Sequence, residues 1–219
     1  MATKRHGAPL ETRGRERTKQ DKRDRIRRAA WELFASAGFD ETTTRAVSRR
    51  AGVAAGTLFL YAPDKTDLLF LVFHDRLSAA ADAALASVPR KAALVDQLTH
   101  VFERLFAMYG EHPALAKQFV AALPGGSGPN AEQVNALTAA FLHRLATLIA
   151  AAAARGEVDR AIAPLQAAGA AFALYFATLM AWISGMTNEA GLAPMMRASL
   201  ELLMRGLAPR APLSPRRAR

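Results

Sequence analysis

Hydroxyl and basic side chains gather in residues 43–65, and their chemistry suits hydrogen bonding to a nucleic acid. Thr43, Thr44 and Arg45 follow one another, and Tyr61 and Lys65 lie a short distance further on. A threonine hydroxyl can cap a helix or bind a phosphate, and an arginine can donate to a phosphate or to the edge of a guanine. These groups therefore predict contacts with a phosphate backbone and with base edges.

Two short helices joined by a glycine turn would position these side chains. Ala46, Val47 and Ala51 recur at helical spacing, and Gly52 can adopt the left-handed conformation that ends a helix. A second helix is expected over 56–61, where a helix-turn-helix inserts its second helix into the major groove. The predicted DNA-contacting residues are Thr43, Thr44, Arg45, Ala55, Gly56, Thr57, Phe59, Leu60, Tyr61 and Lys65.

With residues 25–39 before it and Pro63-Asp64-Lys65 after it, this segment resembles the DNA-binding domain of the TetR family of transcriptional regulators. The resemblance covers residues 26–69 and implies that Tyr61 and Lys65 grip phosphates. The chain departs from the family pattern at Ala54, where a serine-like cap is usual, and at Ala62, where an aromatic residue is usual. Losing the cap costs about 1 kcal/mol of helix stability. Phe59 can be interpreted equally as a DNA contact or as packing within the motif.

Composition restricts the function further. The 219 residues carry a net charge of +10, which attracts polyanions, and contain no cysteine, which excludes disulfides and thiolate zinc sites. Basic residues dominate positions 4–28, where we expect a basic arm that also lies along the phosphate backbone. The lack of cysteine fits a reducing cytoplasm. The charged N-terminus, with no apolar run behind it, argues against a secretory signal or membrane anchor.

Apolar residues recur with helical periodicity along almost the whole chain, which predicts an all-α protein. With the resemblance, this predicts an N-terminal three-helix domain that contains the helix-turn-helix and a C-terminal helical domain for ligand binding and dimerisation. The expected domains are a disordered arm over 1–18, a DNA-binding domain over 19–66, a helical body over 67–208 and a disordered basic tail over 209–219. Helices are expected at about 19–37, 45–51, 56–61, 65–88, 91–109, 113–123, 131–155, 164–186 and 193–207.

Two segments of the body need interpretation. The glycine-rich residues 125–130 predict a mobile loop that ends in Asn130, a good helix cap. Residues 161–188 carry no charge and are longer than the ~20 residues that cross a bilayer. We favour a helix that is buried on both faces over a membrane span, because the side chains along one side of this segment are small enough to let another helix approach closely. That side comprises Ala170, Ala173, Ala177, Ala181 and Ser184.

The resemblance also implies what the body does. In TetR-like proteins the last two helices form a four-helix dimer interface, for which Met196, Leu200, Leu203 and Leu207 offer an apolar stripe. The body binds a small molecule, expected to be lipophilic or aromatic, that releases the protein from DNA. The predicted ligand-binding residues, each of which could also be ordinary core, are Phe102, Phe106, Tyr109, Phe119, Phe141, Tyr175 and Trp182.

The sequence and the resemblance thus predict a homodimeric transcriptional regulator that binds double-stranded DNA. We favour a repressor that binds a palindromic operator. Two alternatives stay open. The basic arm would also suit an architectural protein that coats DNA without choosing sites. An enzyme is disfavoured because the histidines fit no metal-binding or catalytic motif, so no catalytic residue, metal ligand or cofactor is assigned.

Overall fold

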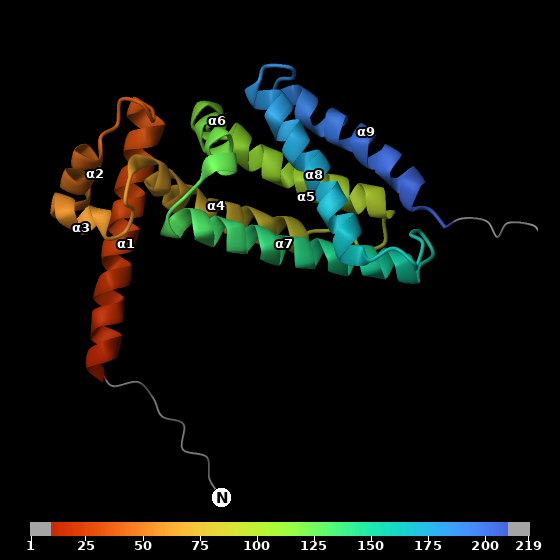
Figure 1. Cartoon of the computed structure of the whole chain (residues 1–219), viewed down its shortest axis with the longest axis horizontal. Helices are drawn as coiled ribbons and strands as arrows, with labels where there is room; N and C mark the ends of the chain where they lie inside the picture. Colours follow the sequence, from red (N-terminus) through yellow and green to blue (C-terminus); the bar gives the residue numbers. More distant parts are fainter. Residues whose placement is uncertain (1–9, 210–219) are drawn as a thin grey trace, which may run out of the picture. The chain divides into compact units, whose positions relative to one another are not determined.

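The computed structural model describes residues 10–209, which fold entirely into helices and connecting turns and contain no strand (Figure 1). The all-α prediction is confirmed. The expected tail and the first half of the expected arm lie outside the described residues. The elements are α1 (Leu10–Ala37), α2 (Thr44–Ala51), α3 (Ala55–Phe59), α4 (Lys65–Ala86), α5 (Leu94–Gly110), α6 (Pro113–Ala122), the short 3₁₀ helix η1 (Leu123–Gly125), α7 (Pro129–Ala154), α8 (Pro164–Ile183) and α9 (Glu189–Leu207).

The helix α1 begins nine residues earlier than expected, so residues 10–18 are helical and not part of a disordered arm. The prediction gave too much weight to the charge of this segment. Arginine, glutamate, lysine and glutamine are good helix formers, and oppositely charged pairs along the helix offset the repulsion between cations. One such pair is Arg25 with Asp21, whose Nε and Oδ2 lie 3.2 Å apart.

The described part of the chain folds into two compact units. The first comprises residues 10–74 and 122–133, and it therefore takes in two segments that were expected to belong to the body. Its core is formed where α1 packs against α2, and α2 against α3. The buried side chains there include Ile26, Ala30, Phe34, Val47, Leu58 and Leu68.

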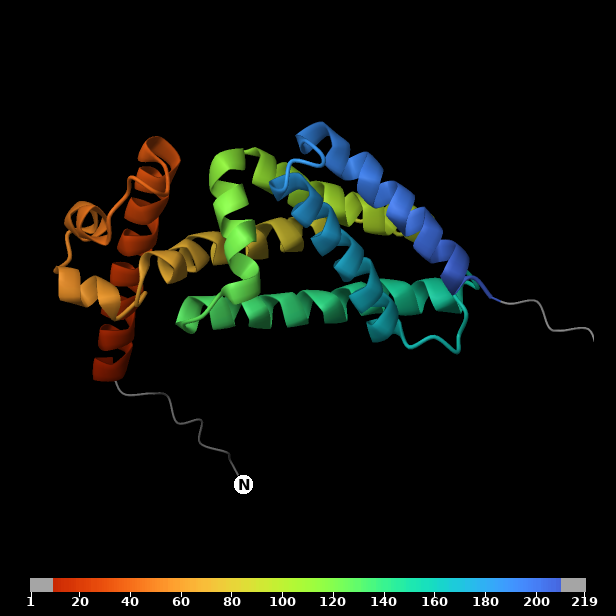
Figure 2. The ribbon, with the colours of Figure 1, turned by 45° about the horizontal axis from the view of Figure 1, so that its top comes forward.

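The second unit comprises residues 75–121 and 134–209. In it α9 packs against both α5 and α8, and α8 and α9 lie side by side in both ribbon views (Figures 1 and 2). By length and apolar composition alone, α7 and α8 could each span a bilayer, a test that buried core helices also pass.

Burial of α8 on both faces, as expected from sequence, is not found within one chain. Tyr175, Leu179 and Trp182 are buried, whereas Ala173 and Ala177 on the small side are exposed. The periodicity identified both faces but could not show that only one of them is covered by the same chain.

The helix α9 also differs from the expectation. It begins at Glu189 because Asn188 caps it, with the Asn188 side-chain oxygen accepting a 3.0 Å hydrogen bond from the Gly191 N–H. Three of the four residues expected at a dimer interface, Met196, Leu200 and Leu207, are buried in the core of their own chain. Met195 and Leu202 are the large apolar side chains of α9 that remain exposed.

Candidate nucleic-acid interface

The N-terminus of α2 is capped as the sequence predicts. Thr43 has an extended backbone, and its hydroxyl oxygen accepts a 3.1 Å hydrogen bond from the Ala46 N–H. The capping hydroxyl keeps its own proton, which is free to be donated outward. Arg45 is exposed at the second position of α2, and Thr44 beside it is half-buried. The first turn of α2 thus presents a hydroxyl and a guanidinium group to solvent.

A glycine turn then sets the direction of α3. Gly52 has φ +65°, a left-handed conformation, and its N–H donates to the Arg49 carbonyl oxygen at 3.2 Å. The α3 helix starts after Ala54, which provides no side-chain cap, and Leu58 anchors it in the core. Ala55 and Gly56 in its first turn are exposed, and Thr57 is half-buried.

Two large apolar side chains project from the end of α3. Leu60 is 82% exposed and Phe59 is 48% exposed. Packing therefore covers only about half of Phe59, and the other half of the side chain is accessible to a partner. An apolar side chain in the major groove can contact the methyl group of thymine, which distinguishes thymine from the other bases.

Tyr61 and Lys65 both have partners inside the first unit. The Tyr61 hydroxyl donates to the Lys19 carbonyl oxygen at 3.2 Å. The Lys65 ammonium group donates to the carbonyl oxygens of Phe39 and Asp40, each at 3.0 Å, and lies 4.5 Å from the centroid of the Phe39 ring. The two side chains thus bond to different parts of the first unit: Tyr61 to a carbonyl group within α1, and Lys65 to the turn that follows α1.

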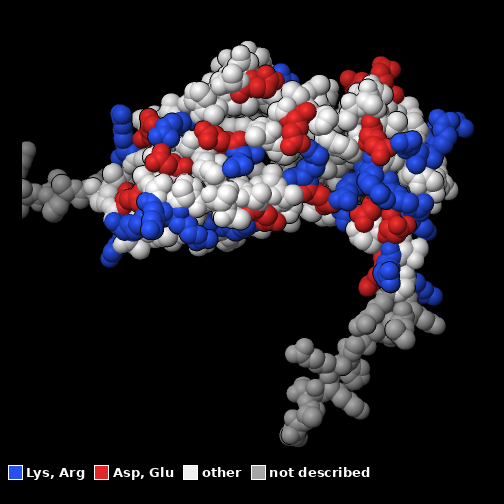
Figure 3. Space-filling view, turned by 180° about the vertical axis from the view of Figure 1, so that it is seen from behind, with Lys and Arg blue, Asp and Glu red and all other residues white. Residues whose placement is uncertain are grey.

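Lys and Arg side chains gather over the first unit, with acidic groups among them (Figure 3). Some of these cations form ion pairs within the unit. Arg27 Nη2 lies 3.2 Å from Asp24 Oδ1, and Arg50 Nη2 lies 2.7 Å from Glu32 Oε2. Arg49 is exposed at the end of α2. Exposed ion pairs are weak, so they exchange readily for phosphate contacts.

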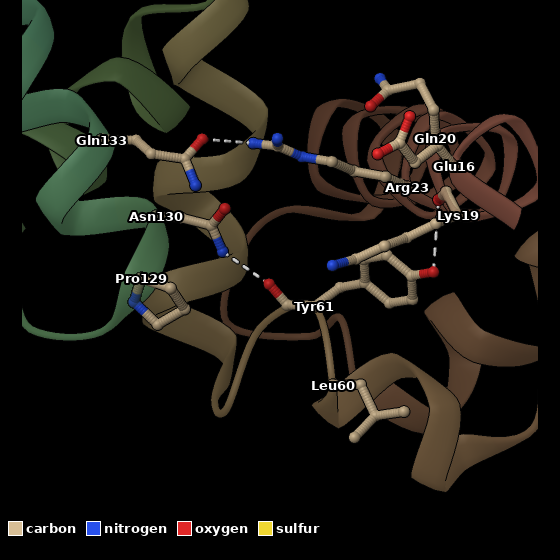
Figure 4. A pocket seen from close by; sticks show the side chains of 9 residues that line it. All are labelled: Glu16, Lys19, Gln20, Arg23, Leu60, Tyr61, Pro129, Asn130 and Gln133. Carbon is tan, nitrogen blue, oxygen red and sulfur yellow. Dashed lines mark hydrogen bonds between the residues drawn. The ribbon is translucent and has the colours of Figure 1, made fainter. Parts of the chain in front are cut away.

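Sequence reasoning assigned no role to Arg23, Asp67 or Gln133 at this site, and it predicted Asn130 only as a helix cap. Arg23, Asn130 and Gln133 line a hollow of about 400 Å³ together with Tyr61 (Figure 4). Asp67 is buried and accepts a hydrogen bond from the Asn130 amide. A signal was present, because Asp67 directly precedes the apolar run of residues 68–73. A carboxylate at such a position needs a hydrogen-bond donor when it is buried, but the sequence does not show that residue 130 is that donor.

The residues predicted to bind a ligand form one aromatic cluster in the second unit. Tyr175 is central: its ring centroid lies 5.0 Å from that of Phe102 and 5.4 Å from that of Phe106. The rings of Phe119 and Trp182 each lie 6.5 Å from Tyr109, and the ring of Phe141 lies 6.4 Å from Phe102. All seven side chains are buried.

Two hydroxyl groups lie inside this apolar cluster. The Tyr175 hydroxyl donates to the Tyr109 hydroxyl at 3.2 Å. Burial raises the pKa of Tyr109 to about 12 and the pKa of Tyr175 well above its ordinary value. Both phenols therefore stay protonated and can act as hydrogen-bond donors within the cluster.

Comparison with known proteins agrees with this geometry. Residues 26–72 match the family profile "Bacterial regulatory proteins, tetR family". The chain is 22% identical to the "Fatty acid metabolism regulator protein" of Bacillus subtilis, over 82% of this chain and 92% of that protein.

Two solved structures are similar to the chain along most of its length. FadR of Thermus thermophilus, a TetR family repressor in complex with lauroyl-CoA, has a TM-score of 0.69 and 25% identity over 88% of this chain and 98% of its own. FadR of Bacillus subtilis in complex with stearoyl-CoA has a TM-score of 0.65 and 22% identity over 84% of this chain and 98% of its own. These relatives are transcriptional regulators and not enzymes. Residues 26–72 therefore carry a DNA-binding domain of the tetR family, and the chain as a whole shares the fold of these TetR-family regulators.

Proposed function

We propose that this regulator is a repressor that binds a palindromic operator as a homodimer and leaves it when a fatty acyl thioester occupies the body. The observation behind the proposal is the outward face of the helix-turn-helix. Arg45 at the start of α2 and Leu60 after α3 are both exposed, next to a first turn of α3 that has only small side chains. That combination allows the backbone to approach the bases closely in the major groove.

In this proposal the contacts divide by chemistry. Arg45 donates to a base edge, while Thr57, Phe59 and Leu60 contact base edges and thymine methyl groups. Thr43, Thr44 and Tyr61 bind phosphates, for which Tyr61 would exchange its bond to the Lys19 carbonyl group for one to DNA. Lys65 supports the surface indirectly, since its ammonium group already holds the end of α1.

The uncovered faces of α8 and α9 support the homodimer. Leu165 on α8 is 45% exposed and Leu202 on α9 is 69% exposed, and the small side of α8 is uncovered as well. Small residues let helices pack closely, so a second copy would bury these faces against its own. A two-fold dimer also explains how one short reading helix gains enough contacts, because two copies read two half-sites.

The aromatic cluster supports a lipophilic effector. It is buried and mostly apolar. Its polar groups are the hydroxyls of Tyr109 and Tyr175, which bond to each other, and the indole N–H of Trp182, which donates to Glu189 at 3.0 Å. The FadR proteins of Thermus thermophilus and Bacillus subtilis were solved with lauroyl-CoA and stearoyl-CoA. We therefore assign Phe102, Phe106, Tyr109, Phe119, Phe141, Tyr175 and Trp182 to the site that accepts an acyl chain, and we place the protein in the cytoplasm with its DNA.

Selection of bound duplexes from a genomic fragment library, followed by a fluorescence anisotropy titration, tests this function. We expect a palindromic site bound at least about 10³-fold more tightly than scrambled DNA. Saturating lauroyl-CoA should weaken that binding about tenfold or more, within the range of allosteric coupling. Equal affinity for selected and scrambled DNA would instead favour an architectural protein, and binding that lauroyl-CoA leaves unchanged would exclude the proposed effector class.

A further inference from the structure

The first turn of α7 is capped by a carboxylate from another helix. Asp67 on α4 is completely buried, and its Oδ1 accepts hydrogen bonds from the N–H groups of Asn130 at 3.0 Å and Ala131 at 3.1 Å. The first N–H groups of a helix have no partner within that helix. Asp67 supplies the missing acceptor, so the start of α7 is fixed to α4.

Asn130 extends this bond network to the DNA-binding motif. Its side-chain amide donates to Asp67 Oδ2 at 2.6 Å. The same amide donates to the Tyr61 carbonyl oxygen at 2.7 Å (Figure 4). Tyr61 follows directly on the last turn of α3, where its N–H donates to the Leu58 carbonyl oxygen at 2.8 Å. Asn130 is itself buried. The amide therefore holds the backbone at the exit of the reading helix.

The segment before α7 is docked, in contrast to the mobile loop expected from its glycines. A Cβ atom at Gly126 would lie 2.5 Å from the Phe70 ring, and one at Gly128 would lie 2.7 Å from the Asp67 carboxylate. Gly128 also has φ +102°, a conformation that side chains rarely allow. Both positions need glycine because the segment lies too close to α4 side chains to leave room for a Cβ atom.

A second bond links the same turn of α7 to α1. The Arg23 guanidinium group donates to the Gln133 side-chain oxygen at 2.6 Å (Figure 4). Beyond this turn α7 continues without a break to Phe141 of the aromatic cluster, eleven residues after Asn130. At 1.5 Å per residue that is about 16 Å along one helix. Asn130 and Phe141 thus belong to one continuous helix.

We propose that Asp67 and Asn130 are positioning residues that hold the exit of α3 in its DNA-binding geometry and pass movements of α7 to it. This inference rests on the proposed function for its regulatory meaning. Hydrogen bonds weaken steeply as their geometry is lost, so a small shift of the first turn of α7 releases the Tyr61 carbonyl group. The Tyr61 side chain, which is carried on the same stretch of backbone, then shifts with it.

Three variants test the proposal. Asn130→Ala removes both side-chain bonds of the amide without adding charge. The double variant Asp67→Asn/Asn130→Asp exchanges the two groups: residue 67 still accepts from the N–H groups of residues 130 and 131 and donates to residue 130, but the Tyr61 carbonyl oxygen has lost its donor. Asn135→Ala is the matched control, because Asn135 is exposed on the same helix.

The first readout is amide hydrogen exchange of residues 58–62, which requires neither DNA nor effector. We expect exchange to be about fivefold faster or more in both Asn130 variants than in the wild type and the Asn135→Ala control. Exchange over 58–62 is compared with that of the buried α1 core in the same protein, because the double variant places a carboxylate at position 130 against the Tyr61 carbonyl oxygen and so lowers overall stability as well. Wild-type exchange over 58–62 in both Asn130 variants would overturn the proposal.

The second readout is affinity for the selected operator with and without lauroyl-CoA. We expect the double variant to bind the operator about fivefold more weakly or worse, and lauroyl-CoA to weaken it further by a smaller factor than in the wild type. Wild-type affinity and a wild-type response would overturn the positioning role. If the wild type showed no operator preference, the proposed function would fail, and the exchange measurement would still decide whether Asn130 positions α3.

Discussion

Among the single residues, Arg45 is the side chain on which base recognition depends most. It is exposed at the start of α2, whereas the first turn of α3 offers no long polar side chain. Replacing it, as Arg45→Ala, should reduce discrimination at particular base pairs of each half-site by about 1–3 kcal/mol, because a bidentate arginine contact distinguishes guanine from other bases. Competition binding against operators changed at one base pair at a time measures this effect.

The control for Arg45 is Arg49→Ala, which removes an exposed arginine from the same helix. We expect this change to weaken binding to all sequences alike, or not at all, and to leave base preference intact. Should Arg45→Ala keep the full base preference of the wild type, base recognition must come from other residues.

His74 on α4 makes stability depend on pH. Burial lowers the pKa of His74 from 6.5, and the positive charges of Arg23 and Arg27 lower it further. Between the lowered value and 6.5 the unfolded chain binds more protons than the folded one. The contribution of His74 to stability is therefore complete above pH 6.5 and is lost as the pH falls through the lowered pKa.

Urea unfolding at about pH 7.5 and about pH 5 checks this prediction. The free energy of unfolding should fall less between these conditions in His74→Gln than in the wild type, since glutamine does not titrate. The same fall in both proteins would show that His74 takes no part in the pH dependence.

For the helices and turns, local chemistry in the sequence accounts for most boundaries. The Thr43 cap and the Gly52 turn were predictable because each acts on neighbours only a few residues away. The start of α9 was missed although its cap, Asn188, is equally local, because Pro194 is a typical first-turn residue and indicates a later start. Local signals therefore identified the helix-turn-helix but not every boundary.

The partners of the helix faces could not be predicted, because they depend on contacts between distant residues. Glycine at 126 and 128 suggests mobility, yet these glycines are required by Phe70 and Asp67 more than fifty residues earlier. The apolar stripe of α9 likewise fits either its own core or a second copy, and the structure assigns most of it to the core. These aromatic residues were predicted to bind a ligand, but neither their packing into one cluster nor the hydrogen bond between Tyr109 and Tyr175 was predicted.

For the molecule as a whole, the proposed dimer depends on the apolar side chains that one chain leaves uncovered. Leu202→Arg places a charge on the exposed face of α9, where burial against a second copy would be costly. We expect the wild type to have twice the mass of one chain in sedimentation equilibrium and Leu202→Arg to be a monomer at micromolar concentration. Asn135→Arg, which adds the same charge to an exposed position on α7, should stay dimeric.

The monomeric variant should also lose most of its operator affinity while its circular dichroism spectrum stays helical, because one reading helix makes too few contacts. If Leu202→Arg dimerised as strongly as the wild type, the dimer interface could not lie on this face of α9.

In the proposed complex, two identical helix-turn-helix units bind successive turns on one side of a DNA duplex. The affinity for operators with altered spacing between the half-sites tests this arrangement. Half-sites one helical turn apart lie about 34–36 Å from centre to centre. Inserting half a turn, about five base pairs, between them moves the second half-site to the opposite side of the DNA. We expect affinity to fall to that of a single half-site. Unchanged affinity for the lengthened operator would contradict the two-fold arrangement.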